Sequence, residues 1–116
     1  MQHTHADVPH FDDKEWTWLR GALSTIDRTM GPFADYKTHY IVPSHVAHHI
    51  FSDMPYYGAM EATPYIAAHL GKYYKKSYAE PVLGSEYLGY WRDFYHAMRA
   101  AVSCRREEGS EFYWFQ

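Results

Sequence analysis

A chain of 116 residues is long enough for one small domain and no more. Its formal net charge of -3, with Lys and Arg scattered along the sequence, argues against nucleic acid as a partner. The single cysteine, Cys104, excludes an intrachain disulfide and a cysteine-based zinc site. No apolar run reaches the roughly 18 residues that a membrane-spanning helix needs. Aromatic residues make up 19% of the chain, which favours surfaces that are half apolar and half wet.

The hydrophobic pattern predicts a mainly α chain. The polar opening, residues 2–10, is expected to be extended because it ends at Pro9. Asp12 or Asp13 is then expected to cap a helix that runs to about Arg28. Apolar residues recur at helical spacing through this stretch, and Gly31 followed by proline should end it.

Three further helices follow in the pattern. The first runs from His45, capped by Ser44, to about Asp53, and the second from Ala59 to Leu70, with Gly71 as its C-terminal cap. Pro64 either starts that second helix, with Thr63 as the cap, or kinks it. Residues 72–81 are expected to form a loop, 85–102 an amphipathic helix, and the aromatic tail 111–115 a strand or an interfacial anchor.

Three of the nine histidines cluster at His45, His48 and His49. On a helix this spacing places all three rings within roughly 100° of arc. Imidazole suits zinc, iron, copper and nickel alike, so spacing does not choose the metal, and the zinc-protease motif is not met. An incidental polar surface is the alternative, but apolar neighbours such as Ile50 indicate partial burial, which would cost several kcal/mol without partners.

Several blocks of sequence occur in an order that is familiar from one enzyme family. They are Gln2-His3-Thr4-His5, Glu15-Trp16-Thr17-Trp18-Leu19-Arg20-Gly21-Ala22-Leu23, Thr25-Ile26-Asp27-Arg28, His45-Val46-Ala47-His48-His49 and Ala59-Met60-Glu61-Ala62-Thr63. Together they resemble the C-terminal third of the microsomal delta-12 (omega-6) and omega-3 fatty-acid desaturases. The resemblance covers nearly the whole chain and weakens between residues 73 and 106.

The resemblance implies a function and a ligand set. The chain would be the C-terminal cytosolic cap of a histidine-box membrane desaturase, at the cytosolic face of the endoplasmic reticulum membrane. His45, His48 and His49 match the third histidine box of a two-iron centre, His3 matches a further ligand, and His39 a position close to the ligands. No other catalytic or cofactor-binding residue is assigned. The partners implied are an acyl lipid substrate, a cytochrome-type electron donor that works with O2, and the membrane.

Two departures from the family pattern leave other activities open. Pro43-Ser44 replaces the usual Asp-Thr before the third box, and residues 55–58 replace Pro-His-Tyr-His, which admits a divergent hydroxylase or acetylenase. The first two histidine boxes do not occur in this sequence, so residues 1–116 are expected to form one part of a desaturase domain, with no second domain. Alone, the chain should bind metal weakly and lack desaturase activity. A non-catalytic docking remnant and a small soluble histidine-metal domain stay open as alternatives.

Overall fold

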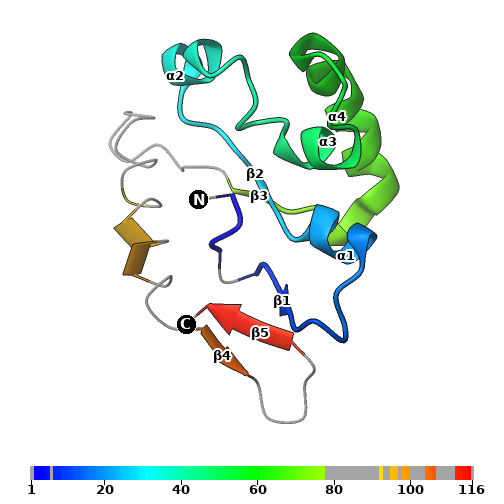
Figure 1. The fold of residues 1–116 in the computed structure, drawn as a ribbon. Coiled ribbons are helices and arrows are strands. Elements are labelled where there is room, and N and C mark those ends of the chain that lie inside the picture. The colour runs from blue at the N-terminus through cyan, green and yellow to red at the C-terminus, as the bar shows by residue number, and fades with distance from the viewer. Residues whose placement is uncertain are drawn as a thin grey trace.

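The chain folds into short helices and strands, described here from a computed structural model (Figure 1). The structure describes residues 2–5, 7–77, 92, 95–96, 98–99, 104–106 and 112–115. Within residues 7–77, the helices are α1 (Trp18–Leu23), α2 (Pro32–Lys37), α3 (His45–Ile50) and α4 (Tyr56–Leu70), and a 3-10 turn at Gly71–Tyr73 follows α4. The strands are β1 (His10–Phe11), β2 (Asp27–Arg28), β3 (Lys76–Ser77), β4 (Cys104–Arg106) and β5 (Phe112–Phe115).

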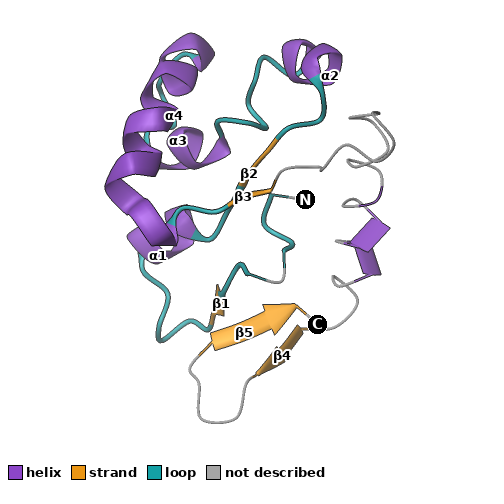
Figure 2. Cartoon of the chain, turned by 180° about the vertical axis from the view of Figure 1, so that it is seen from behind, coloured by secondary structure: helices purple, strands orange, loops and turns teal. Residues whose placement is uncertain are grey.

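Among the described residues, two small sheets connect distant parts of the chain. One is antiparallel, in the order β1-β5-β4, with His10 opposite Tyr113 and Cys104 opposite Phe115. The other is the parallel pair β2-β3, with Asp27 opposite Lys76. Both views place α2, α3 and α4 at one end, the antiparallel sheet at the other, and β2-β3 between them (Figures 1 and 2). The aromatic tail is therefore a strand, which was one of its two predicted forms.

The core is built from small aliphatic side chains around α3. This helix packs against α1 and α4, and its Val46 and Ala47 are buried, as are Ala22 of α1 and Ala59 of α4. Small side chains let short helices approach closely, which suits elements of only six residues. The packing fixes the position of α3, and the three histidines of this helix are each partly buried.

The long first helix predicted from Asp12 or Asp13 to Arg28 is wrong. Asp12 accepts hydrogen bonds within a turn that ends at residue 16, and α1 begins only after Thr17, whose hydroxyl accepts the Arg20 N–H. The helix stops at Leu23 because the following residues bond to other segments, and Asp27–Arg28 pairs with β3. An apolar stripe at helical spacing was thus overridden by tertiary hydrogen bonds.

Helix α2 was not predicted. It begins at Pro32, directly after Gly31, whose φ of 91° few other residues adopt. The buried Asp35 carboxylate holds the turn before it, accepting the Thr29 hydroxyl at 2.6 Å and the Met30 N–H at 2.8 Å. Beyond α2, two consecutive non-glycine residues at 39 and 40 have left-handed backbone, with φ of 52° and 55°.

The two helices that follow were predicted, with altered ends. Helix α3 starts at His45 as expected but ends at Ile50, earlier than Asp53. Helix α4 begins at Tyr56 rather than Ala59 and contains Pro64, so Thr63 does not cap it; its hydroxyl donates to the Ala59 carbonyl. Gly71 ends the helix as predicted, with a φ of 53°.

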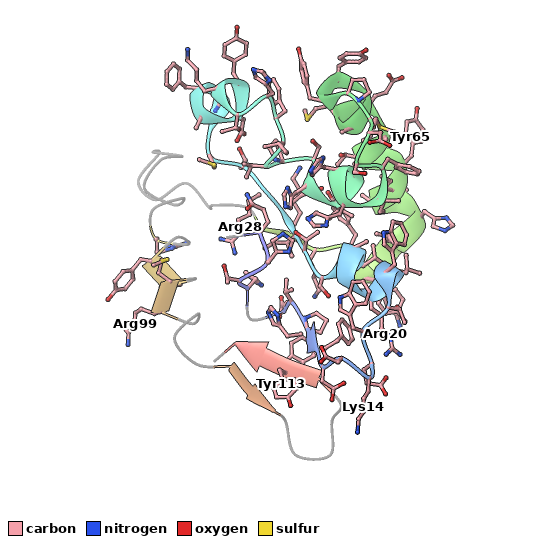
Figure 3. All side chains as sticks on the ribbon, in the orientation of Figure 1. Lys14, Arg20, Arg28, Tyr65, Arg99 and Tyr113 are labelled. Atoms are coloured by element: carbon pink, nitrogen blue, oxygen red, sulfur yellow. The ribbon has the colours of Figure 1, made fainter. Side chains whose placement is uncertain are left out.

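The mainly α class is confirmed, with small sheets added. Among the described residues, no helix has the length and apolar character needed to span a bilayer. The predicted helix 85–102 lies outside the described residues except for Arg92, Tyr95, His96, Met98 and Arg99, which are helical. Large aromatic side chains lie on the surface of the helical end, and Tyr65 on α4 is 74% exposed (Figure 3).

Candidate metal centre

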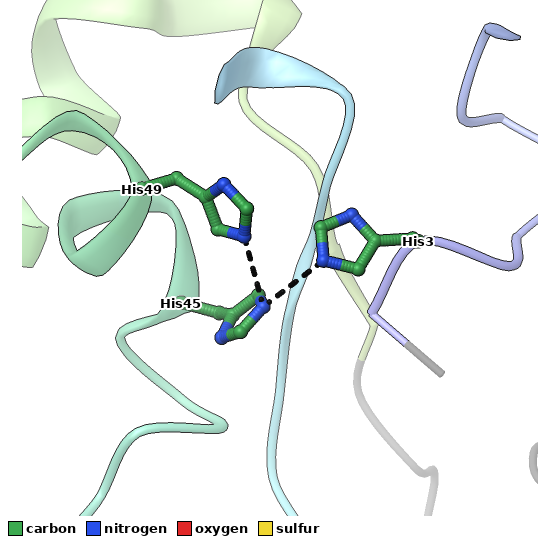
Figure 4. A group of neighbouring side chains, drawn as sticks. All are labelled: His3, His45 and His49. Atoms are coloured by element: carbon green, nitrogen blue, oxygen red, sulfur yellow. Dashed lines mark hydrogen bonds between the residues drawn. The ribbon is translucent and has the colours of Figure 1, made fainter. Parts of the chain in front are cut away.

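Three histidines from two distant segments meet beside α3. His45 and His49 project from adjacent turns of the helix, and His3 approaches from the N-terminal segment, 42 positions before His45 (Figure 4). The Nε2 atom of His45 lies 3.3 Å from Nε2 of His3 and 3.2 Å from Nε2 of His49. One ligand atom from each of the three residues lies within 4.8 Å of the others.

These separations fit ligands of one metal ion. Two imidazole nitrogens bound to a metal at about 2.0–2.1 Å and at a tetrahedral angle lie about 3.4 Å apart. The separations of 3.3 Å and 3.2 Å among the three rings are close to that value. Two of the three pairs therefore already have the separation that a shared ion requires, and the ligand atoms of the third pair, His3 and His49, lie within 4.8 Å of each other.

Backbone carbonyls orient two of the rings. Nδ1 of His3 lies 3.0 Å from the Ser24 carbonyl oxygen, and Nδ1 of His45 lies 3.3 Å from that of Ile41. A carbonyl oxygen only accepts, so we infer that each Nδ1 carries the hydrogen and that each Nε2 of a neutral ring carries the lone pair. This is the arrangement that positions metal-binding histidines in proteins.

The contact between His3 and His45 then joins two acceptors. Two neutral rings whose Nε2 lone pairs face each other at 3.3 Å have no hydrogen between them. A proton could bridge them, but burial, together with the neighbouring rings of His49 and His3, lowers the pKa of His45 to about 4. Burial also lowers the pKa of His49. These shifts favour the unprotonated form of His45 and His49 at neutral pH, which is the form of imidazole that binds metal.

The remaining predicted ligand, His48, lies on the same helix but outside this group. Its ring centroid is 5.8 Å from that of His45 and 6.0 Å from that of His49. Its role as a ligand stays a prediction. His39 is exposed and its ring lies 5.5 Å from that of Tyr56, so its predicted place close to the ligands also stays a prediction.

A buried carboxylate beneath α3 was not identified from the sequence. Asp27, on β2, is 0% exposed; its Oδ1 accepts the Val46 N–H at 2.8 Å, and its Oδ2 accepts the Tyr74 hydroxyl. Burial raises the pKa of this carboxyl, although both hydrogen bonds oppose the shift. In the sequence, Asp27 stood out only as part of the Thr25-Ile26-Asp27-Arg28 block, in a stretch where a helix was expected.

An apolar cavity of about 630 Å³ borders the segment that holds His3. Its walls include Leu23, Ile26 and Leu70, and also Ser24, the residue whose carbonyl orients His3. Cationic side chains also line it, among them Lys72. Cavities of this size are typical of small-molecule sites in proteins.

No protein-family model and no solved structure matches this sequence. Curated plant proteins do. The chain is 44% identical to the fatty acid conjugase FAC2 B of Calendula officinalis over 120 residues, which cover all of this chain and 28% of that protein. It is 55% identical to the Delta(12)-fatty-acid desaturase FAD2 of Vernicia fordii over 75 residues, 65% of this chain and 19% of that protein.

A third relative adds a location in its name. The omega-6 fatty acid desaturase, endoplasmic reticulum isozyme 1, of Glycine max is 53% identical over 75 residues, which are 65% of this chain and 19% of that protein. The chain thus spans between 19% and 28% of the length of these relatives. The predicted resemblance is confirmed: the chain belongs to the fatty-acid desaturase family, and its sequence fits the C-terminal part of a delta-12 desaturase.

Proposed function

We propose that this chain supplies part of the metal centre of a fatty-acid desaturase. The observation that carries the proposal is the convergence of Nε2 atoms from His3, His45 and His49 at distances that suit a shared ion. In the complete enzyme this ion would be one of two irons, with His48 as a further ligand of the centre. The other ligands of the two irons are expected outside this sequence.

The chemistry that iron supplies when bound is oxidation of an unactivated acyl chain. Two hydrogens leave the chain as the double bond forms, and O2 is reduced to two waters with two protons and two electrons from a cytochrome-type donor. No amino-acid acid or base can break such a C–H bond by itself. The part of this chain is to supply imidazole ligands, two of which are oriented by backbone carbonyls.

Substrate and location follow from the relatives and from the surface of the chain. The relatives are named for fatty-acid desaturation and conjugation, and one name places its protein in the endoplasmic reticulum. We assign to the whole protein an acyl lipid substrate and a position at the cytosolic face of that membrane. The apolar cavity beside the His3 segment and the exposed aromatic side chains suit contact with an acyl chain and a bilayer interface.

Cobalt(II) binding tests the metal proposal on the 116-residue chain. Titration followed by the visible absorption spectrum should give weak, one-to-one binding. His3→Ala, His45→Ala and His49→Ala should each weaken the affinity by at least about tenfold, because each removes a nitrogen ligand. His69→Ala, which removes an exposed histidine of α4, is the control and should leave binding unchanged. Equal binding by wild type and His45→Ala would refute the site.

A chimera tests the reaction. The 116 residues would replace the matching segment of the Vernicia fordii desaturase, and the chimera would be expressed in yeast, whose lipids contain monounsaturated acyl chains. Gas chromatography should detect a new diene, which His45→Ala abolishes and His69→Ala retains. A hydroxylated or acetylenic product would indicate a divergent activity of the same centre. No new product, despite normal membrane levels of the chimera, would refute the proposed reaction.

The assembled cluster also supports a second candidate, a small metal-binding domain without redox chemistry. All three of its nitrogen ligands come from this chain alone. This alternative predicts tight cobalt(II) binding by the isolated chain and no product from the chimera.

A further inference from the structure

The side chain of the residue that precedes helix α3 does not cap its first turn. Ser44 occupies the capping position of α3, but its side chain makes no capping hydrogen bond; its hydroxyl donates to the Tyr40 carbonyl instead. The first N–H groups of any α-helix lack an acceptor within the helix. An acceptor must therefore come from elsewhere, since Val46 is only 3% exposed and its N–H cannot rely on water.

The acceptor is Asp27, 19 positions earlier in the chain. Its Oδ1 accepts the Val46 N–H at 2.8 Å, and its Oδ2 accepts the hydroxyl of Tyr74. A fully buried carboxylate carries a large desolvation cost, so a position concerned only with packing would favour an apolar side chain. The carboxylate bridges three segments that are far apart in sequence, with β2 in the middle.

The same stretch of chain also holds His3. The Ser24 carbonyl orients the His3 ring, and the Thr25 hydroxyl and the Ile26 N–H both donate to the Gln2 carbonyl, at 3.2 Å and 3.1 Å. Residues 24–26 therefore fix the segment that carries His3, and residue 27 fixes the helix that carries His45 and His49. The four consecutive residues 24–27 therefore determine how far His3 lies from the helix that carries His45 and His49.

We propose that Asp27 is a positioning residue for the metal centre: as the acceptor for the Val46 N–H, it holds α3 at the distance from His3 that lets the three imidazoles share one ion. The role in metal binding rests on the proposed function, but the positioning role does not need a metal. Tyr74 supports it by fixing the second carboxylate oxygen.

The test uses NMR on the metal-free 116-residue chain. The ring centroids of His3 and His49 are 4.8 Å apart, which should give a nuclear Overhauser effect between their ring protons in the wild type. Asp27→Ala should abolish this effect and speed amide exchange of Val46 at least tenfold. Asp27→Asn keeps an oxygen acceptor, so it should restore both. Cobalt(II) affinity should fall by about 10–100-fold in Asp27→Ala and recover in Asp27→Asn.

Asp35→Ala is the matched control. It also removes a buried carboxylate that accepts a backbone N–H, but the donors that lose this acceptor, the Met30 N–H and the Thr29 hydroxyl, lie beside α2. Asp35→Ala should lower the free energy of unfolding while leaving the nuclear Overhauser effect between the His3 and His49 rings intact. If Asp35→Ala and Asp27→Ala change this effect equally, or if Asp27→Ala leaves it unchanged, the positioning role is overturned.

A further variant keeps the test decisive if Asp27→Ala does not fold. Tyr74→Phe preserves the ring and removes only the hydroxyl that fixes the carboxylate, so it should speed Val46 exchange several-fold; unchanged exchange would overturn the proposal. The two hypotheses fail separately. Unchanged cobalt(II) binding in His45→Ala refutes only the metal site. The nuclear Overhauser effect between the His3 and His49 rings is measured without metal, so it tests only the positioning role of Asp27.

Discussion

Acid should destabilise the metal-free chain through His45. This ring is half-buried, and its burial, with further contributions from the neighbouring imidazoles, lowers its pKa from 6.5 to about 4. In the unfolded chain the ring regains its ordinary pKa and takes up a proton first as the pH falls. The contribution of an unprotonated His45 to the unfolding free energy is thus fully present above pH 6.5 and declines between pH 6.5 and about 4. Below that range His45 causes no further loss of stability.

The magnitude follows from the size of the shift. Taken in full, the displacement corresponds to about 3.4 kcal/mol, and solvent screening of a ring that is partly exposed reduces it to about 1–2 kcal/mol. Between about pH 7.5 and about pH 5, which covers only part of the titration, the expected loss from this residue is about 1 kcal/mol. His49, whose pKa is lowered by burial, adds to the loss with the same sign.

Urea unfolding with a chelator present measures this loss. The unfolding free energy of the wild type would be determined at both pH values by tryptophan fluorescence, and compared with that of His45→Ala and the control His69→Ala. The difference between the two pH values should shrink by about 1 kcal/mol in His45→Ala and stay the same in His69→Ala. If His45→Ala loses as much stability on acidification as the wild type, His45 is not held unprotonated by its surroundings and the reasoning fails.

Three further substitutions probe the frame around the site. Asp35→Ala should cost about 1–3 kcal/mol of unfolding free energy in urea, because two partly buried donors lose their acceptor, whereas Asp13→Ala on the surface should leave that free energy unchanged. Tyr40→Asn should gain about 0.5–1 kcal/mol, because asparagine tolerates left-handed backbone; Tyr36→Asn, an exposed helical control, should give no gain in the same assay. Thr17→Ala should cost about 1 kcal/mol by removing the cap of α1, measured as a lower thermal midpoint; an unchanged midpoint would show that this cap contributes nothing.

Sequence signals within a few residues predicted helices α3 and α4. Ser44 before a run of helix-compatible residues located the start of α3, and Gly71 located the end of α4. The spacing of His45 and His49 placed both rings on one side of the helix, as the structure shows. These features depend on residues within a few positions of one another, which is the range that sequence patterns cover.

Such local patterns could not predict the contacts between segments that are distant in the sequence. The stripe of apolar residues before Arg28 has helical spacing, yet the backbone after Leu23 bonds to the N-terminal segment and to β3. No local rule shows that Ile26 will donate to Gln2 or that Asp27 will accept from Val46. The same limit explains why His3 entered the predicted ligand set only through the family resemblance, 42 positions away from its partner.

The geometry of the cluster explains why the chain should hold metal only weakly by itself. His3, His45 and His49 give three nitrogen ligands, one fewer than a closed tetrahedral site, and so leave at least one position for another group. Their segments are joined through short hydrogen-bonded stretches rather than a large core, so bringing the rings together offsets part of the binding free energy. In a complete desaturase the remaining ligands would close the centre, and the position of α3, fixed from β2, would decide how well the two ligand sets match.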